Sequence, residues 1–151
     1  MFEILLSEDI AAPPEVVWGV ITNTEDYPLW NTFVVSCDST FRVGDPIHMK
    51  VRVLPFMTQP QTETIWRNEE GKLLDYGIKA PLGALTSTRQ HRLSATASGG
   101  THYESVFRLE GWFAPVVGLL FGAQLRRGFG EMTRGIARRS VHVHEASNAA
   151  S

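Results

Sequence analysis

The middle of the chain, residues 32–110, is a succession of short strand-like segments that are separated by tight turns. The candidate strands are Thr32–Asp38, Asp45–Leu54, Gln59–Arg67, Lys72–Lys79, Leu85–Ala97 and Thr101–Glu110. The gaps between them are rich in glycine and proline, which favour turns. Because every connection is short, segments that are adjacent in the sequence should also pair in space. This part of the chain therefore predicts an antiparallel meander.

One strand and two short helices are expected before the meander. Phe2–Ile10 has the pattern of a first strand, and the Pro-Pro-Glu sequence at residues 13–15 suits the first turn of a helix. Apolar residues then recur at helical spacing over Val16–Ile21. Cap and turn residues follow, and a second short helix is expected over Glu25–Leu29.

The last third of the chain has the pattern of one long amphipathic helix. An apolar stripe runs through it at spacings of mostly three and four, and its members are Val117, Leu120, Phe121, Leu125, Phe129, Met132 and Ile136. Most arginines of this region fall off the stripe. We expect a helix from Pro115 to about His142, followed by a flexible tail over Ala146–Ser151.

Length and composition fit one domain, expected over residues 1–145. The chain has 151 residues and is 43% hydrophobic, and a chain of this size buries roughly 70% of the surface that it exposes when unfolded. The lone Cys37 excludes an internal disulfide and a multi-cysteine zinc site. The formal net charge of -2 argues against general nucleic-acid binding. Acidic residues follow Met1 at once, which is unlike a secretory signal, so a cytoplasmic location is expected.

These elements together predict an α+β protein. A curved antiparallel sheet of six or seven strands would wrap around the long C-terminal helix, with the two short helices following the first strand. A strongly curved sheet cannot close on a single helix without leaving space between the two. We expect the functional site in that space, because ligand sites are concave and mostly apolar.

Several motifs are similar to those of a known superfamily. They are Ala12–Trp18, Tyr27–Asn31, the turn Gly99–Thr101 with Gly111 ten residues after it, and the helix around residues 129–132. These motifs resemble the START/Bet v 1-like superfamily, in its polyketide cyclase/dehydrase and lipid-transport (SRPBCC) branch, over residues 2–142. The resemblance implies a helix-grip fold with a deep hydrophobic cavity. The motifs are structural, and a fold does not by itself transfer an activity.

Strand alternation predicts which side chains line the cavity. On the last strand the inner face carries Tyr103, Ser105 and Phe107, and on the strand before it Arg89 and His91. A buried Arg89 needs an acid or a ligand oxygen, and Glu63 is the candidate acid. The expected ligand-binding residues are Glu63, Tyr76, Ile78, Arg89, His91, Tyr103, Ser105, Phe107, Leu125, Phe129 and Met132.

Three functions are compatible with such a cavity. The first is binding of a hydrophobic small molecule, such as a lipid, quinone, polyketide or aromatic compound, for carriage or sequestration. The second is a cyclase, aromatase or dehydratase, with His91 as base and Arg89 or Tyr103 stabilising an enolate oxygen. Family members often carry a glutamate at the position of Phe107, and its absence argues against acid catalysis from that wall. The third is an interaction module whose cavity is plugged by Trp30, Phe107 and Phe129.

Other partners find weaker support in the sequence. His142 and His144 are two residues apart at a helix end, which is not a spacing that places two metal ligands on one face, so neither a metal nor a cofactor is expected. From Trp112 onward five arginines and two glutamates give a charge of +3 beside the apolar segment Trp112–Gly122. These arginines form either a solvated face or a surface for transient contact with anionic lipid headgroups. A monomer and a homodimer both remain open.

Overall fold

The chain begins with a strand, continues through short helical turns and a meander of strands, and ends with one long helix. The computed structural model describes residues 1–151. In chain order its elements are β1 (Phe2–Ile10), α1 (Pro14–Thr22), the 3-10 turn η1 (Thr24–Asp26), α2 (Tyr27–Trp30), β2 (Val34–Ser39), β3 (Pro46–Val51), β4 (Gln59–Glu69), β5 (Leu73–Lys79), the 3-10 turn η2 (Pro81–Gly83), β6 (Thr86–Ala95), β7 (Thr101–Glu110) and α3 (Ala114–Ala150).

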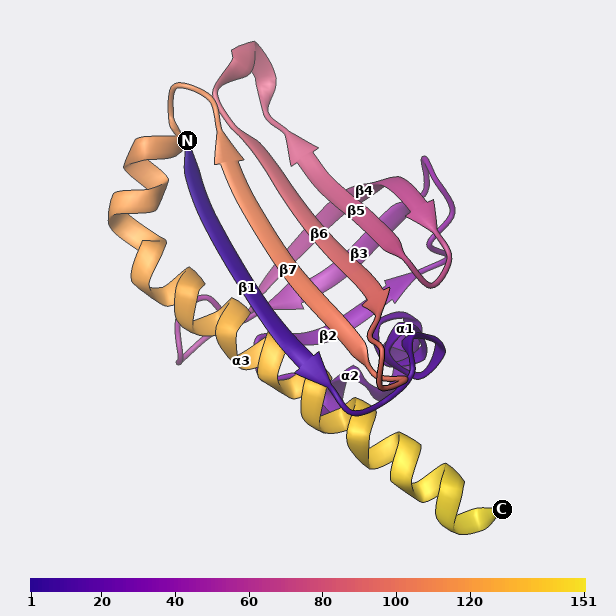
Figure 1. The fold of residues 1–151 in the computed structure, drawn as a ribbon. Helices are drawn as coiled ribbons and strands as arrows, with labels where there is room; N and C mark the ends of the chain where they lie inside the picture. The colour runs from indigo at the N-terminus through magenta and orange to yellow at the C-terminus, as the bar shows by residue number, and fades with distance from the viewer.

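The seven strands form one antiparallel sheet in the order β1-β7-β6-β5-β4-β3-β2. The sheet curls around α3, as Figure 1 shows, and this confirms the predicted α+β helix-grip architecture. The predicted meander is confirmed too, because β2 to β7 pair in sequence order. The first strand, β1, pairs with β7, so Phe2 lies opposite Leu109 at one edge of the sheet.

The helices differ from the predicted ones mainly at their ends. The second short helix is split into η1 and α2 because Pro28 stands in its first turn. The last helix, α3, does not end near His142 but continues to Ala150, so Ala146–Ala150, expected as a tail, are helical. Its final turns extend past the sheet (Figure 1), and no helix of the chain is both long and apolar enough to cross a membrane.

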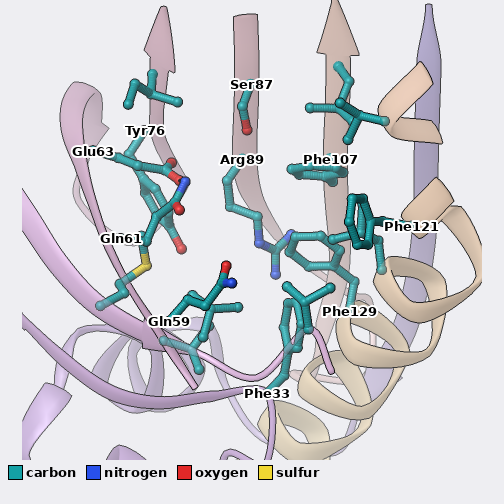
Figure 2. A pocket seen from close by; sticks show the side chains of 18 of the residues that line it. Phe33, Gln59, Gln61, Glu63, Tyr76, Ser87, Arg89, Phe107, Phe121 and Phe129 are labelled. Carbon is teal, nitrogen blue, oxygen red and sulfur yellow. The ribbon is translucent and has the colours of Figure 1, made fainter. Parts of the chain in front are cut away.

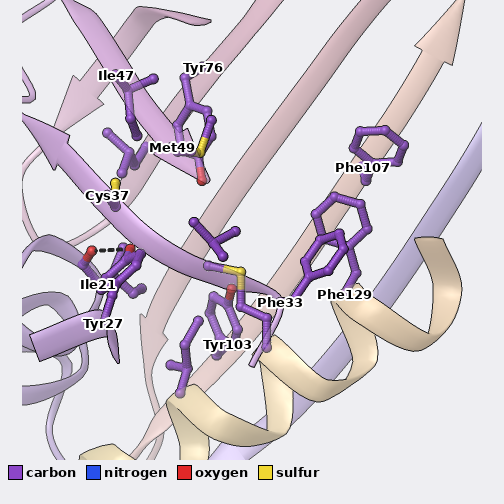
Figure 3. Close-up of a cluster of buried hydrophobic side chains, with 14 of the residues drawn as sticks. Ile21, Tyr27, Phe33, Cys37, Ile47, Met49, Tyr76, Tyr103, Phe107 and Phe129 are labelled. Carbon is purple, nitrogen blue, oxygen red and sulfur yellow. Dashed lines mark hydrogen bonds between the residues drawn. The ribbon is translucent and has the colours of Figure 1, made fainter. Parts of the chain in front are cut away.

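The hydrophobic core fills one end of the space between sheet and α3. It includes Ile21, Tyr27, Tyr103, Met132 and Ile136, each at most 3% exposed. Figure 3 shows part of this core, in which the Tyr27 hydroxyl donates a 2.6 Å hydrogen bond to the Ile21 carbonyl oxygen. This end is closed by α1, which contacts both α3 and β6. The other end of the same space is not filled by side chains.

Helix α3 lies close to Phe33, which directly precedes β2, because a glycine faces the aromatic ring. A β-carbon added at Gly128 would overlap with the ring of Phe33. The side chain of Phe33 in turn packs edge to face on Phe129, with 4.8 Å between the ring centroids. Gly128 therefore allows the close approach that brings the apolar stripe of α3 over the concave face of the sheet.

Candidate functional site

An open cavity of about 320 Å³ lies between the concave face of the sheet and α3 (Figure 2). It is lined by 21 residues, of which 16 are hydrophobic. The α3 wall consists of Val117, Phe121, Leu125 and Phe129, and the remaining lining residues are Phe33, just before β2, and residues of β2 to β7 and the loops between them. This is the composition expected of a site for a largely apolar small molecule.

The entrance is marked by lining residues that are also solvent-exposed. Ile78 on β5 is 42% exposed, Met57 in the β3–β4 loop 40%, and Phe121 on α3 37%. Two more apolar side chains, Phe56 and Leu82, are exposed in the β3–β4 and β5–β6 loops. The cavity therefore opens between these loops and the first turns of α3, where apolar side chains are exposed.

The structure divides the predicted ligand-binding residues into two layers. Seven of them line the cavity: Glu63, Tyr76, Ile78, Arg89, Phe107, Leu125 and Phe129. The other four, His91, Tyr103, Ser105 and Met132, do not line it and form a buried layer behind Arg89. Strand alternation places His91, Tyr103 and Ser105 on the correct face, and Met132 belongs to α3. From two residues deeper along β6 and β7, however, the space is already filled from α3 and α1.

Arg89 is the polar group at the boundary between the two layers. Its side chain is 3% exposed and lines the cavity. The Nη1 atom donates a 2.6 Å hydrogen bond to the Ser105 hydroxyl, and Nη2 lies 3.5 Å from the Tyr103 hydroxyl. The guanidinium also lies over the Phe129 ring, 4.8 Å from its centroid, a cation–π contact. Neighbours on sheet and helix thus fix the orientation of this side chain.

His91 lies in the layer behind Arg89, between two tyrosines. Its Nδ1 atom lies 2.6 Å from the Tyr103 hydroxyl and its Nε2 atom 3.2 Å from the Tyr76 hydroxyl. Burial and the nearby Arg89 charge lower the pKa of His91 well below its usual value, so the imidazole is neutral at neutral pH. Burial also raises the pKa of Tyr76 and of Tyr103, which keeps both phenols protonated.

Glu63 and Arg89 both line the cavity, but they do not form the expected ion pair. Arg89 on β6 lies opposite Tyr76 on the neighbouring strand β5. Glu63 belongs to β4, on the far side of β5, and two strand spacings separate β4 from β6 by about 10 Å. The Glu63 carboxylate instead accepts a 3.0 Å hydrogen bond from the Gln61 amide. Burial raises the pKa of Glu63, although that hydrogen bond and the Arg89 charge act in the opposite direction.

Three phenylalanines pack beside the cavity without filling it. The rings of Phe107 and Phe129 stack with 4.5 Å between their centroids, and Phe33 packs edge to face against Phe129. In Figure 2 Arg89 extends into the space between this aromatic wall and the side of the cavity that carries Glu63 and Gln61. Trp30 does not line the cavity. The expected plug of an interaction module is therefore not formed.

Some lining residues could not be found by strand alternation because they lie outside regular strands. Phe33 stands just before β2, and Leu54 and Met57 belong to the β3–β4 loop. Gln59, at the first position of β4, is signalled by the alternation that places Gln61 and Glu63 inward. Glu63 is also the only acidic lining residue, and no cysteine or histidine lines the cavity, so the wall is poor in metal-ligating groups.

The fold is shared with several solved structures of low sequence identity. A START superfamily protein from Mycobacterium smegmatis is 12% identical with a TM-score of 0.74, over 93% of this chain and 98% of that chain. The Zhui aromatase/cyclase from Streptomyces sp. R1128 is 12% identical with a TM-score of 0.73, over 92% and 93%. Protein NE0264 from Nitrosomonas europaea is 17% identical with a TM-score of 0.73, over 95% and 96%. At these identities the likeness establishes the fold and not the activity.

No curated protein sequence matches the chain. A family model, described as polyketide cyclase / dehydrase and lipid transport, matches residues 1–142. The match agrees with the helix-grip fold and with the apolar cavity under α3. The chain therefore belongs to the polyketide cyclase/dehydrase and lipid-transport family.

Proposed function

We propose that the protein binds a hydrophobic small molecule in the cavity between the sheet and α3, and carries or sequesters it. The observation that carries this proposal is the cavity wall, in which 16 of 21 lining residues are hydrophobic. Burying about 300 Å² of apolar ligand surface contributes about 7 kcal/mol before the costs of association are subtracted. Lipids, quinones, polyketides and aromatic compounds all supply such a surface.

The environment of His91 favours a carrier over the enzyme in which His91 is the base. A general base must reach the proton that it removes. Both ring nitrogens of His91 already contact tyrosine hydroxyls, and the imidazole does not line the cavity. Its role in this proposal is to satisfy Tyr76 and Tyr103 and so to hold the layer that supports Arg89.

A cyclase-type enzyme is the second candidate, and the position of Glu63 is the observation in its favour. Its carboxyl group lines the cavity and has a raised pKa, which suits a general acid or base. Arg89, on the same cavity wall, could stabilise an enolate oxygen. In this assignment the acid is Glu63 on β4, in place of the glutamate that family members often carry at the position of Phe107, and His91 takes no part.

Native mass spectrometry of the protein purified from its own cells tests the first proposal. Leu125→Trp would fill the cavity from α3, and Leu119→Trp is the matched control, because Leu119 lies on the same helix and is 87% exposed. We expect a bound small molecule on the unaltered protein and on Leu119→Trp, and its loss from folded Leu125→Trp. Equal occupancy of both variants would overturn the cavity as the binding site.

Glu63→Gln separates the carrier from the enzyme in the same experiment. A carrier is purified with the same molecule whether or not the carboxyl group is present. An enzyme that uses Glu63 accumulates its substrate in the variant and its product in the unaltered protein. The two bound molecules then differ in mass where water is lost, and in chromatographic retention and fragmentation where the product is an isomeric ring. Identical mass, retention and fragmentation would therefore rule out the Glu63-dependent reaction.

A further inference from the structure

Arg89 brings one uncompensated positive charge to the wall of the cavity. Every contact of its nitrogens is with a neutral group: the Ser105 and Tyr103 hydroxyls, the Gln90 and Val106 carbonyl oxygens and the Met132 sulfur. No carboxylate forms an ion pair with it. A buried charge without a partner of opposite sign is strongly destabilising, so this site has an unmet demand for a negative group.

The guanidinium has donors that no protein group fully satisfies. Nη1 is occupied by its 2.6 Å hydrogen bond to Ser105. Nε is buried and has no hydrogen-bond partner, and the two contacts of Nη2 are long, 3.5 Å to Tyr103 and 3.7 Å to Met132. In a planar guanidinium Nε and Nη2 donate in the same direction, and together they match the two oxygens of a carboxylate.

The neighbouring groups do not neutralise the charge from within. The pKa of Tyr103 is raised by burial, so its phenol does not become an anion, and the lowered pKa of His91 means that no second cation is added. Arg89 is the only basic residue among the lining residues, and burial raises the pKa of Glu63, the only acidic one, which favours the neutral form of that carboxyl group. A single cation is matched by a ligand with one negative charge, whereas a dianion would leave an excess charge in an apolar cavity.

We propose that the ligand is an amphiphile with a single carboxylate, which accepts hydrogen bonds from the guanidinium of Arg89. The apolar part of the ligand lies along Phe107, Phe129 and Leu125 toward the entrance. The Phe129 ring under the guanidinium holds the guanidinium in place. This inference rests on the proposed function, since it narrows the class of ligand for the same cavity.

Displacement of the neutral fluorescent probe N-phenyl-1-naphthylamine tests this assignment. Decanoic acid and decan-1-ol, compared at neutral pH, differ only in the head group, and 2-naphthoic acid with 2-naphthalenemethanol repeats the comparison for an aromatic skeleton. The variant is Arg89→Met, which keeps length without charge. Arg92→Met is the matched control, because Arg92 lies on the same strand, is exposed and points to the other face of the sheet.

We expect the acid of at least one pair to bind the unaltered protein and Arg92→Met at least tenfold more tightly than its alcohol. In Arg89→Met this preference should disappear while the alcohol still binds. Alcohols that bind as tightly as their acids to the unaltered protein in both pairs, or an acid preference that survives in Arg89→Met, overturn the assignment of Arg89. Failure of the probe, acids and alcohols alike to bind would instead overturn the proposed function.

Discussion

The Nδ1 atom of His91 and the hydroxyl of Tyr103 lie 2.6 Å apart, fully buried behind the cavity. On its other side the ring contacts the Tyr76 hydroxyl through Nε2. A neutral imidazole has one donor and one acceptor nitrogen, so one tyrosine accepts a hydrogen bond and the other donates one. Protonation would turn both nitrogens into donors and would place a second positive charge beside Arg89.

The stability of the protein should therefore depend on pH through His91. The folded-state pKa of His91 is depressed, so its contribution to stability is complete above its unfolded pKa of about 6.5 and is lost as the pH falls below that value. Between pH 7.5 and pH 5.5 we expect a loss of about 1.4 kcal/mol from this residue. Urea unfolding at both pH values measures it.

The control for this prediction is His91→Gln, which should lack the loss of unfolding free energy that His91 causes between pH 7.5 and pH 5.5. Other groups titrate in both proteins and cancel in the comparison. Hydrogen bonding to Asp9 raises the pKa of His102, which favours the folded state at low pH, and the raised pKa of Glu63 acts in the same sense. An unchanged difference between the two pH values in His91→Gln would contradict the prediction.

Ser105→Ala should destabilise the fold by about 1.5–3 kcal/mol, because it removes the only short hydrogen bond of a buried charged group. Ser87→Ala is the matched control. Ser87 is also buried and lines the cavity, but its hydroxyl does not bond to Arg89, and we expect a change below about 0.5 kcal/mol. Thermal and urea unfolding measure both, and equal losses would show that Ser105 does not support Arg89.

Phe129→Ala should enlarge the cavity and shift its ligand preference toward bulkier molecules. The substitution removes a ring that stacks on Phe107 and lies under Arg89, at a cost of about 3–5 kcal/mol in stability. Phe129→Leu removes less volume and serves if the alanine variant does not fold. Displacement of a neutral probe by alcohols of increasing size measures the preference. An unchanged optimum in both variants would exclude Phe129 as a determinant of size.

Gly128→Ala should destabilise the protein although alanine favours helices. The added methyl group overlaps with the Phe33 ring, and overpacking of this kind costs about 1–3 kcal/mol. Gly130→Ala on the same helix is the control, because its β-carbon would meet only the flexible end of Arg134, 3.3 Å away. There the better helix propensity stabilises by up to about 1 kcal/mol. Chemical denaturation of the two variants should give opposite signs.

Much of the fold follows from local patterns. The strand Thr101–Glu110 has the predicted bounds, because a glycine-rich turn precedes it and Gly111 ends it with a positive φ of 107°. Alternation along β6 correctly places Arg89 and His91 on the concave face, where both are buried. These features depend on the two-residue alternation of side chains along a strand and on the residue types in turns, both of which can be identified in the sequence itself.

The division of the inner face into a cavity wall and a filled layer could not be predicted in this way. Alternation gives Arg89 and His91 the same side of the sheet, but only the position of α3 decides that Arg89 meets open space and His91 does not. That position depends on the contact between Gly128 and Phe33, which are far apart in the sequence. The absent Glu63–Arg89 ion pair has a different origin, since β5 lies between Glu63 on β4 and Arg89 on β6.

The pairing of β1 with β7 has a consequence for how the protein forms during synthesis. Phe2 lies opposite Leu109, so the first strand has no partner until nearly three quarters of the chain has been made. Such long-range pairings slow folding. The cavity needs in addition Leu125 and Phe129 from the helix that follows. The binding site is therefore among the last parts of the molecule to be completed, and a nascent chain or fragment that ends before α3 cannot hold a ligand in it.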